Sequence, residues 1–287
     1  MGLFSFAVLS DTERRLPFYL VGVGFDFNQD MDPHSREEGY PYYQWIQCVE
    51  GEGLLRLGER EITVCANQAM FLLPGEPHQY YSRGGPWRVH WFTFGGRGVP
   101  DVLSSIGMNQ SGVYGVGNGD LLQEKIRFGM RQLLARDPLH AMECSALVYD
   151  FLIALMRYAH PTNHESVERK YRRLRPVFDF ISENYHNVIT VDRLARTLGV
   201  TPQHFCHLFK DAMRQRPFEY LNSFRIARSK DLMLEEPELP LSDISRQCGY
   251  ESLNYFCSVF RKLEGMSPGH YRKLHSPLFS QSGSVAP

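Results

Sequence analysis

The sequence predicts a multi-domain protein in which a β-rich N-terminal half precedes an all-helical C-terminal half. Its 287 residues correspond to roughly two domains of ordinary size. In residues 1–118, short aromatic and aliphatic runs alternate with Gly and Pro, as in a chain of short strands. From residue 169 onward, apolar residues recur at helical spacing and no strand pattern is present.

The strand-like runs of the first half are short and evenly spaced, and turn residues separate them. Residues 54–57 and 61–64 flank a hairpin turn at Gly58-Glu59, and Gly51-Glu52-Gly53 forms another turn before them. Such strands are typical of a small barrel or sandwich. The expected strands cover residues 43–49, 54–57, 61–64, 69–73 and 88–94.

Residues 119–159 carry two runs of apolar residues at helical spacing, which Asp137-Pro138 interrupts. This pattern predicts two amphipathic helices, which either pack on the β domain or expose an apolar stripe to a second subunit. Residues 160–168 have the polar composition of a linker, and residues 276–287 resemble a disordered tail.

The charge is divided unevenly along the chain. The net charge is −1, and the hydrophobic content of 43% is that of an ordinary globular protein. Residues 1–160 nevertheless carry 13 Lys and Arg against 18 Asp and Glu, whereas residues 161–287 carry 18 against 14. A basic C-terminal half suggests a nucleic-acid partner.

Targeting and cysteine patterns point to a reducing compartment. The N-terminus has no basic region followed by a cleavage site, so we expect no secretory signal. The longest apolar stretch, residues 146–156, is too short to span a bilayer. The six cysteines form no CxxC pair, and we expect free thiols in a cytoplasmic protein.

An internal repeat dominates the basic half. Residues 194–200 (LARTLGV) and 244–250 (ISRQCGY) share one pattern at an offset of 50, and the following segments match at an offset of 51. Each unit predicts a helix, a turn at Gly199 or Gly249, and a second helix, with a small residue at Ala195 or Ser245 for close packing. One such unit could be a packing hairpin, but a duplicated unit with basic residues after an aromatic residue favours DNA binding. The expected N-caps are Thr190 and Ser242 for the first helices, and Thr201 and Ser252 for the second.

The second unit resembles the DNA-binding domain of AraC/XylS-type bacterial transcription regulators. The matching residues are Ile244, Cys248-Gly249-Tyr250, Ser252, Tyr255-Phe256, Phe260-Arg261-Lys262, Gly265, Ser267-Pro268 and Tyr271-Arg272. Residues 220–234 resemble the helix that links the two units of that family, and the domain would cover residues 169–275. The resemblance implies two recognition helices that enter successive major grooves about 34 Å apart.

The same resemblance assigns roles on the recognition helices. The base-reading positions are Gln203, His204, Cys206, His207, Leu253, Asn254, Cys257 and Ser258, and the phosphate contacts are Thr190, Lys210, Ser242, Arg261 and Lys262. Gln203 and Asn254 suit adenine, and Leu253 suits a thymine methyl group. Many relatives carry Arg where this chain has His207 and Ser258. Arg214 replaces the glycine found at Gly265, so we expect an altered turn after the first recognition helix.

The first half resembles the N-terminal domain of the sugar-sensing members, including the arabinose-responsive one. Residues 50–53, 71–80 and 87–94 carry this likeness, which implies a cupin-like β-barrel that binds a small effector and a helical segment that dimerises. Arg36 and Tyr80 match ligand-contacting positions, and an Arg among aromatic rings suits a sugar. The candidate effector site comprises Arg36, Tyr42, His78, Tyr80, His90 and Trp91.

Two other functions remain open at this point. A metal-dependent cupin enzyme could use His34, Glu37 or Glu38, His78 and His90, but the His-x-His spacing of such sites is absent, and His34 and His78 could simply lie in a loop and a turn. We therefore expect no metal, cofactor or catalytic residue. Alternatively, the barrel only dimerises and binds no ligand. The resemblance implies a nucleoid-associated homodimer that binds an operator and RNA polymerase, and no membrane.

Overall fold

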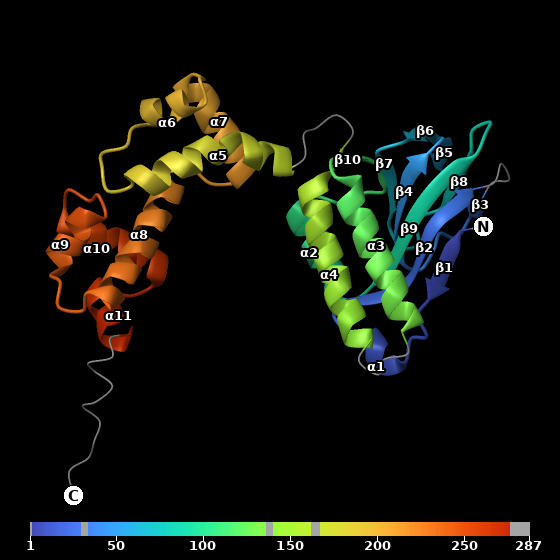
Figure 1. The fold of residues 1–287 in the computed structure, drawn as a ribbon, viewed down its shortest axis with the longest axis horizontal. Coiled ribbons are helices and arrows are strands. Elements are labelled where there is room, and N and C mark those ends of the chain that lie inside the picture. The colour runs from blue at the N-terminus through green and yellow to red at the C-terminus, as the bar shows by residue number, and fades with distance from the viewer. Residues whose placement is uncertain (1, 30–33, 136–139, 162–166, 276–287) are drawn as a thin grey trace, which may run out of the picture. The chain divides into compact units, whose positions relative to one another are not determined.

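The computed structural model describes residues 2–29, 34–135, 140–161 and 167–275. The chain divides into two compact units, Met1–Arg169 and Lys170–Pro287 (Figure 1). The expected break at Asp137-Pro138, most of the expected linker at 160–168 and the expected tail at 276–287 lie outside the described residues. Within the described ranges, no helix has the length and apolar character needed to cross a membrane.

The first unit contains two antiparallel sheets that face each other. The large sheet has the strand order β1-β2-β9-β4-β7-β10-β11, and the small sheet has the order β3-β8-β5-β6. An apolar cluster fills the space between the sheets, with Ile46 and Met70 from the large one and Leu55 and Tyr80 from the small one. The strands are β1 Leu3–Phe6, β2 Tyr19–Gln29, β3 His34–Arg36, β4 Tyr43–Glu50, β5 Glu52–Leu57, β6 Arg60–Cys65, β7 Gln68–Leu72, β8 His78–Ser82, β9 Trp87–Gly95, β10 Gly112–Val116 and β11 Ala159–Pro161.

Helices cover the other face of the large sheet. They are α2 Val99–Ile106, α3 Gly119–Leu134 and α4 His140–Tyr158, with α3 and α4 side by side (Figure 1). The short helix α1 Asp11–Arg14 lies between β1 and β2 in the chain. Asn118 caps α3 by accepting a hydrogen bond from the Leu121 amide at 3.2 Å. Phe151 of α4 stacks on Phe92 of β9 with 4.1 Å between ring centroids. The two predicted amphipathic helices are therefore present, and their apolar stripes pack on the sheet.

The first half matches the expected β-rich fold, with differences in detail. All five expected strands are present, including the hairpin between β5 and β6. Two local expectations are wrong, because His34 begins β3 instead of lying in a loop and His78 begins β8 instead of lying in a turn. The two residues belong to neighbouring strands, since β3 pairs with β8.

The second unit consists of helices that build two apolar cores. Its helices are α5 Val167–Asn184, α6 Val191–Thr197, α7 Pro202–Met213, α8 Pro217–Glu235, α9 Leu241–Gln247, α10 Leu253–Glu264 and α11 Pro268–His275. The first core gathers residues of α5, α6 and α7 around Phe205 and Phe209. The second gathers residues of α9, α10 and α11 around Phe256 and Phe260. The long helix α8 contributes to both cores.

The helix boundaries confirm three of the four expected caps. Thr190, Thr201 and Ser252 accept hydrogen bonds from the amides of Arg193, His204 and Tyr255. The fourth expectation is wrong. Ser242 lies inside the first turn of α9, and the N-cap position belongs to Pro240, which has no side-chain acceptor. Its carbonyl oxygen instead accepts the amides of residues 243 and 244.

The expected change in the turn after α7 is also wrong. Arg214 ends α7 in the left-handed conformation, with φ 55°, and its amide donates to the Lys210 carbonyl oxygen at 2.9 Å. Gly265 ends α10 with φ 74° and an amide donated to the Arg261 carbonyl oxygen at 3.0 Å. The two units therefore share one closing turn, although only the second has the residue that adopts it without steric cost.

Candidate DNA-reading surface and effector site

Helix α7 presents a polar face to solvent and an aromatic face to the first core. Phe205 and Phe209 are fully buried, whereas Gln203, His207 and Lys210 are exposed at positions that share one side of the helix. His204 is exposed beside them, and Cys206 is half-buried against the core. Six of the eight expected base-reading positions form three pairs between the two units, namely Gln203 with Asn254, Cys206 with Cys257 and His207 with Ser258.

Helix α10 repeats this arrangement 51 residues later. Asn254, Ser258 and Arg261 are exposed on one side, in the positions that Gln203, His207 and Lys210 occupy on α7. Leu253 and Lys262 are also exposed, and Cys257 is half-buried like Cys206. Ser258, Arg261 and Lys262 line a shallow depression together with Cys257 and Ser267. The structure therefore gathers the expected reading residues of each unit on one exposed helix face.

Tyr255 is among the residues that carry the family resemblance, but it was not expected to lie on the DNA-reading surface. This residue follows Asn254 on α10, and its side chain is 55% exposed although it is a large aromatic. It occupies the position of His204 in the first unit, so both units place a ring beside the reading face. Phe256 and Phe260 are spaced four residues apart on the buried side of the helix, and Tyr255 does not fit this spacing. An aromatic residue outside the buried spacing is the signal that could have indicated it.

The expected phosphate contacts fall at helix beginnings and on the exposed face. Thr190 is the exposed N-cap of α6, whereas Ser242 is exposed in the first turn of α9 without a capping hydrogen bond. Lys210, Arg261 and Lys262 are exposed near the C-terminal ends of α7 and α10. Cations at those ends also interact favourably with the helix dipole.

In the first unit, three of the expected effector residues, Arg36, His78 and Tyr80, lie on the paired strands β3 and β8. Tyr80 lies between the sheets, and the rings of His34 and His78 stack near it with centroid distances of 5.4 Å and 6.1 Å. Arg36 lies over the ring of Tyr40 at 5.2 Å. Its positive charge opposes the rise that burial causes in the pKa of Tyr80.

Tyr42 joins this group through its neighbours. Its ring packs edge-on against Tyr40 and Tyr19, and its hydroxyl accepts a hydrogen bond from Arg14 of α1 at 2.9 Å. Trp91 packs against the same inter-sheet cluster as Tyr80. Tyr19 and Tyr40 were not among the expected residues, because isolated tyrosines carry no distinguishing pattern.

His78 is the most informative residue of this group. Its side chain is only 4% exposed, and its Nδ1 lies 2.8 Å from the Glu76 carbonyl oxygen, so Nδ1 must donate. Burial lowers the pKa of His78 and keeps the ring neutral. The remaining nitrogen, Nε2, is then a buried acceptor, and it has no hydrogen-bond partner among the residues that the structure describes. A buried acceptor lowers the stability of the folded state unless it receives a hydrogen bond.

His90 is not brought together with the other expected effector residues. On β9 its side chain points to the helix-covered face, where it stacks on Phe25 at 3.8 Å and Nδ1 accepts the Asp26 amide at 3.0 Å. Trp91, the next residue, points between the sheets. This alternation separates the two residues, and the structure gives only Trp91 access to the inter-sheet space.

The residues considered for a metal site do not form one. Glu37 and Glu38 are exposed, and His34 and His78 stack near one tyrosine ring. Across the described ranges, no group of three or more His, Cys, Asp or Glu side chains could hold a metal ion.

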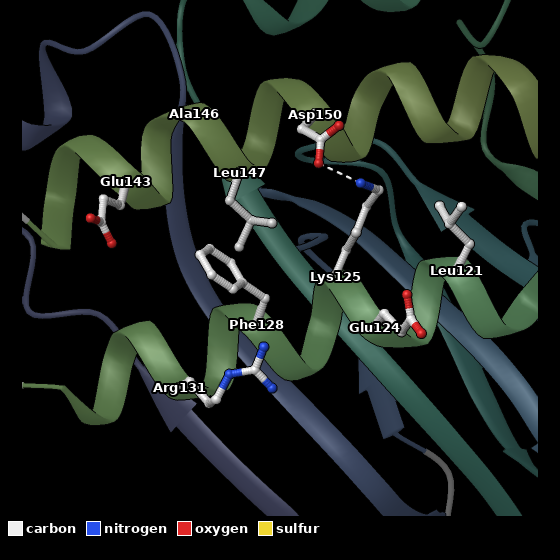
Figure 2. Close-up of a pocket in the computed structure, with 9 residues that line it drawn as sticks. All are labelled: Leu121, Glu124, Lys125, Phe128, Arg131, Glu143, Ala146, Leu147 and Asp150. Carbon is white, nitrogen blue, oxygen red and sulfur yellow. Dashed lines mark hydrogen bonds and ion pairs between the residues drawn. The ribbon is translucent and has the colours of Figure 1, made fainter.

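A groove of about 600 Å³ runs between α3 and α4 on the side away from the sheet (Figure 2). Phe128 of α3 and Leu147 of α4 face each other across its floor, and Phe128 is 37% exposed. Lys125 spans the groove to form an ion pair with Asp150. Glu124, Arg131 and Glu143 complete a charged rim.

Two protein-family profiles match the chain. The AraC-like ligand binding domain profile matches residues 23–152, and the helix-turn-helix domain profile matches residues 194–274. The first match covers most of β2, strands β3 to β10, α2, α3 and most of α4, and the second covers both repeated units. The profiles therefore divide the chain in the same order as its two compact units.

Three curated relatives are similar at low identity. The MmsAB operon regulatory protein of Pseudomonas aeruginosa is 24% identical over 256 residues, which cover 86% of this chain and 80% of the relative. The lactose operon transcription activator of Staphylococcus xylosus is 25% identical over 242 residues, with 82% and 86% covered. The uncharacterized HTH-type transcriptional regulator YpdC of Escherichia coli is 27% identical over 138 residues, and this match spans 48% of each chain.

The profiles and relatives agree with the geometry of both units. A duplicated helix-turn-helix unit with two exposed polar helix faces follows a β domain that a ligand-binding profile matches. The chain therefore combines an AraC-like ligand binding domain at residues 23–152 with a helix-turn-helix domain at residues 194–274, and it is similar over most of its length to an operon regulatory protein and a transcription activator.

Proposed function

We propose that this regulator reads an operator through α7 and α10 and responds to a small effector, a sugar or glycoside, bound in the first unit. In this proposal residues 1–118 bind the effector, 119–159 dimerise, 160–168 link the halves and 169–275 bind DNA. The observation that carries the DNA part is the matched exposure of Gln203 and Asn254, His207 and Ser258, and Lys210 and Arg261 on the two helices. Amide side chains pair with adenine, and cations contact phosphates.

Two substitutions separate base reading from phosphate contact. Asn254→Ala should relax the preference at one base pair and cost about 1–3 kcal/mol on the preferred sequence. Lys210→Gln should instead weaken binding to all sequences and reduce the salt dependence of log K by about one unit. Binding-site selection with the purified protein supplies the sequences. An unchanged preference in Asn254→Ala would show that our assignment of the second reading face is wrong.

The effector part is supported by polar groups that face the inter-sheet space. The unpartnered Nε2 of His78 can accept a hydrogen bond from a ligand hydroxyl, and the Arg36 guanidinium can donate to other hydroxyl oxygens. Tyr42, Tyr80 and Trp91 offer ring surface for the C–H face of a sugar. A similar protein, the Staphylococcus xylosus activator, is named for the lactose operon.

Thermal shift with a panel of sugars and glycosides tests the effector part. A ligand at a hundred times its Kd should stabilise the first unit by about 2.7 kcal/mol. His78→Asn keeps a donor for the Glu76 carbonyl oxygen but removes Nε2, so it should abolish the shift. His90→Asn is the matched control, because it alters a buried histidine on the opposite face of the sheet. If no sugar shifts the transition while operator binding is intact, the barrel serves only for dimerisation.

The dimerisation part places a second copy of the chain on the groove between α3 and α4. An apolar floor with a rim of both charge signs suits a self-complementary interface. Phe128→Glu should convert a dimer to a monomer in sedimentation equilibrium. Phe4→Glu alters another exposed aromatic residue of the same unit and should leave the association state unchanged. Equal behaviour of the two variants would place the interface elsewhere.

Control would follow from a shift in the arrangement of the two halves. An effector changes this equilibrium only if it contacts one arrangement more strongly than the other. We propose that effector binding alters how the DNA-binding halves of a dimer occupy the operator and thereby how RNA polymerase is recruited. Footprinting with and without the effector identified by thermal shift tests this step, and an identical footprint and transcript level would contradict it.

A further inference from the structure

Helix α8 contributes to the first core of the DNA-binding unit and then to the second, and Arg225 lies between these two parts of the helix. Leu221 is buried in the first core and Ile226 in the second. Arg225 is half-buried between them, and its loss of solvent lowers the pKa of its guanidinium. A cation withdrawn from water at this point needs hydrogen-bond acceptors from the protein.

The segment that leads into the first repeated unit supplies both acceptors. Arg225 Nε donates to the Tyr185 carbonyl oxygen, and Nη2 donates to the Asn187 carbonyl oxygen, each at 2.8 Å. These carbonyls belong to the turn between α5 and α6. Because the guanidinium is planar and rigid, two such bonds fix the turn relative to α8.

The second repeated unit contacts the same guanidinium. The Tyr250 ring centroid lies 5.4 Å from Arg225 Cζ, and its hydroxyl donates to Asn222 Oδ1 of α8 at 3.3 Å. Gly249 comes closer still. A Cβ atom at this position would lie 2.4 Å from the Tyr185 carbonyl oxygen and 2.7 Å from Arg225 Nη2. The turn of the second unit therefore packs directly against the first.

The equivalent glycine of the first unit has no such neighbour. Gly199 and Gly249 both adopt positive φ, 64° and 78°, as their turns require. A Cβ atom on Gly199 would nevertheless meet no other atom within 4 Å. The close approach at Gly249 is thus a feature of the contact between the units and not of the helix-turn-helix turn itself.

We propose that Arg225 is a positioning residue which, with Gly249 and Tyr250, holds the two helix-turn-helix units at one orientation and so sets the spacing of the DNA elements that the regulator accepts. This inference rests on the proposed DNA-reading function. One added base pair shifts the second element by about 3.4 Å and turns it by about a tenth of a helical turn. Two rigidly joined recognition helices match one spacing, whereas loosely joined helices match several.

The first test needs no DNA. Spin labels carried by an unnatural amino acid at Arg196 of α6 and Arg246 of α9 report the distance between the two units in the full chain. The native protein should give one narrow distance distribution. Arg225→Lys, which keeps the charge but loses the two-point fork, should broaden it, and Gly249→Ala should broaden it further.

Matched controls separate this effect from general damage. Arg228→Lys changes an arginine on the exposed side of the same helix, and Gly199→Ala changes the equivalent glycine, which has open space. Both should keep the narrow distribution. If Gly249→Ala does not fold, as judged by circular dichroism, Arg225→Lys alone decides. A broad native distribution, or a narrow one in Arg225→Lys, would overturn the proposal.

The second test uses the selected operator with its two elements moved apart or together by one and two base pairs. The native protein should lose affinity about tenfold or more at the first altered spacing, comparable to the loss at a mismatched base pair. Arg225→Lys should lose about threefold or less over the same step, while Arg228→Lys behaves like the native protein. An equally steep profile in Arg225→Lys overturns the inference. If the native protein selects no sequence at all, the proposed DNA-reading function fails instead, and the spin-label distances still decide the structural claim.

Discussion

Replacing Arg214 by glycine should stabilise the DNA-binding unit, although it removes a large side chain. Arg214 ends α7 with φ 55° and ψ 15°. This left-handed conformation costs a residue with a Cβ atom about 1–2 kcal/mol. Glycine adopts it freely but loses about 0.5–1 kcal/mol more backbone entropy on folding. The difference leaves a net stabilisation of about 0.5–1 kcal/mol, which raises the transition midpoint by about 2–8 °C for a unit of this size.

The chain offers a clean assay for this change. The three tryptophans are Trp45, Trp87 and Trp91, and all lie in the first unit, so their fluorescence follows that unit alone. Far-UV circular dichroism at 222 nm follows the helices of both units, and the part of its transition that fluorescence does not share belongs to the second unit. Arg214→Gly should therefore raise the dichroism midpoint and leave the fluorescence midpoint unchanged.

The control for charge is Arg214→Ala. The Arg214 charge helps to lower the pKa of Asp211, which pairs with Lys170, and both substitutions remove it equally. Only Arg214→Gly also removes the Cβ atom. The reciprocal change Gly265→Ala should destabilise the equivalent turn by about 1 kcal/mol. Equal midpoints for the two Arg214 variants would refute the argument that the turn is strained.

Three further predictions follow from the same kind of contact. Thr190→Ala removes an N-cap and should lower the free energy of unfolding, followed by dichroism, by about 1 kcal/mol. Ser242→Ala removes no capping bond and should change this free energy by less than about 0.5 kcal/mol. Burial lowers the pKa values of His78 and His90, so the unfolded first unit binds more protons than the folded one below about pH 6.5. Its fluorescence-monitored stability should therefore fall as the pH drops from 7 toward 5, less steeply in His78→Asn, and a flat native profile would contradict this. Phe151→Ala removes the ring stacked on β9 and should cost about 3–5 kcal/mol in the fluorescence transition, and a loss below 1 kcal/mol would show that this stack is not part of the core.

The helical half could be predicted well because its signals are local. Gly199 and Gly249 mark turns, and Thr201 and Ser252 cap the helices that follow them. The error at Ser242 arose because α9 begins two residues earlier than a cap at Ser242 requires, and the Pro240 carbonyl oxygen accepts the first amides. A proline at this position carries no side-chain signal.

The sheet half was less predictable because its main strand depends on distant partners. β2 spans eleven residues and was not expected, since Gly22 and Gly24 interrupt its apolar pattern. Both glycines make room for rings from other strands. A Cβ atom on Gly22 would lie 2.6 Å from the Phe6 ring, and one on Gly24 would lie 2.0 Å from Trp91 Nε1. Contacts between residues so far apart in the chain leave no local pattern.

The effector residues illustrate the same limit at the level of a single strand. Alternation along β9 requires that His90 and Trp91 face opposite ways, but the sequence does not say which of them faces the small sheet. The structure decides this through Phe25, which covers His90 on the helix side. The unpartnered Nε2 of His78 was equally hidden, because only the path of the backbone past Glu76 determines which ring nitrogen is occupied.

The continuity of α8 has a consequence for insertions and deletions. A single residue added between Leu221 and Ile226 would rotate everything after it by about 100° and advance it by about 1.5 Å. Ile226 and Met233 would then leave the second core, and α10 would take a new orientation relative to α7. Side chains in this segment can vary, but its length cannot. We therefore expect the number of residues here to be invariant wherever the duplicated unit reads two successive grooves.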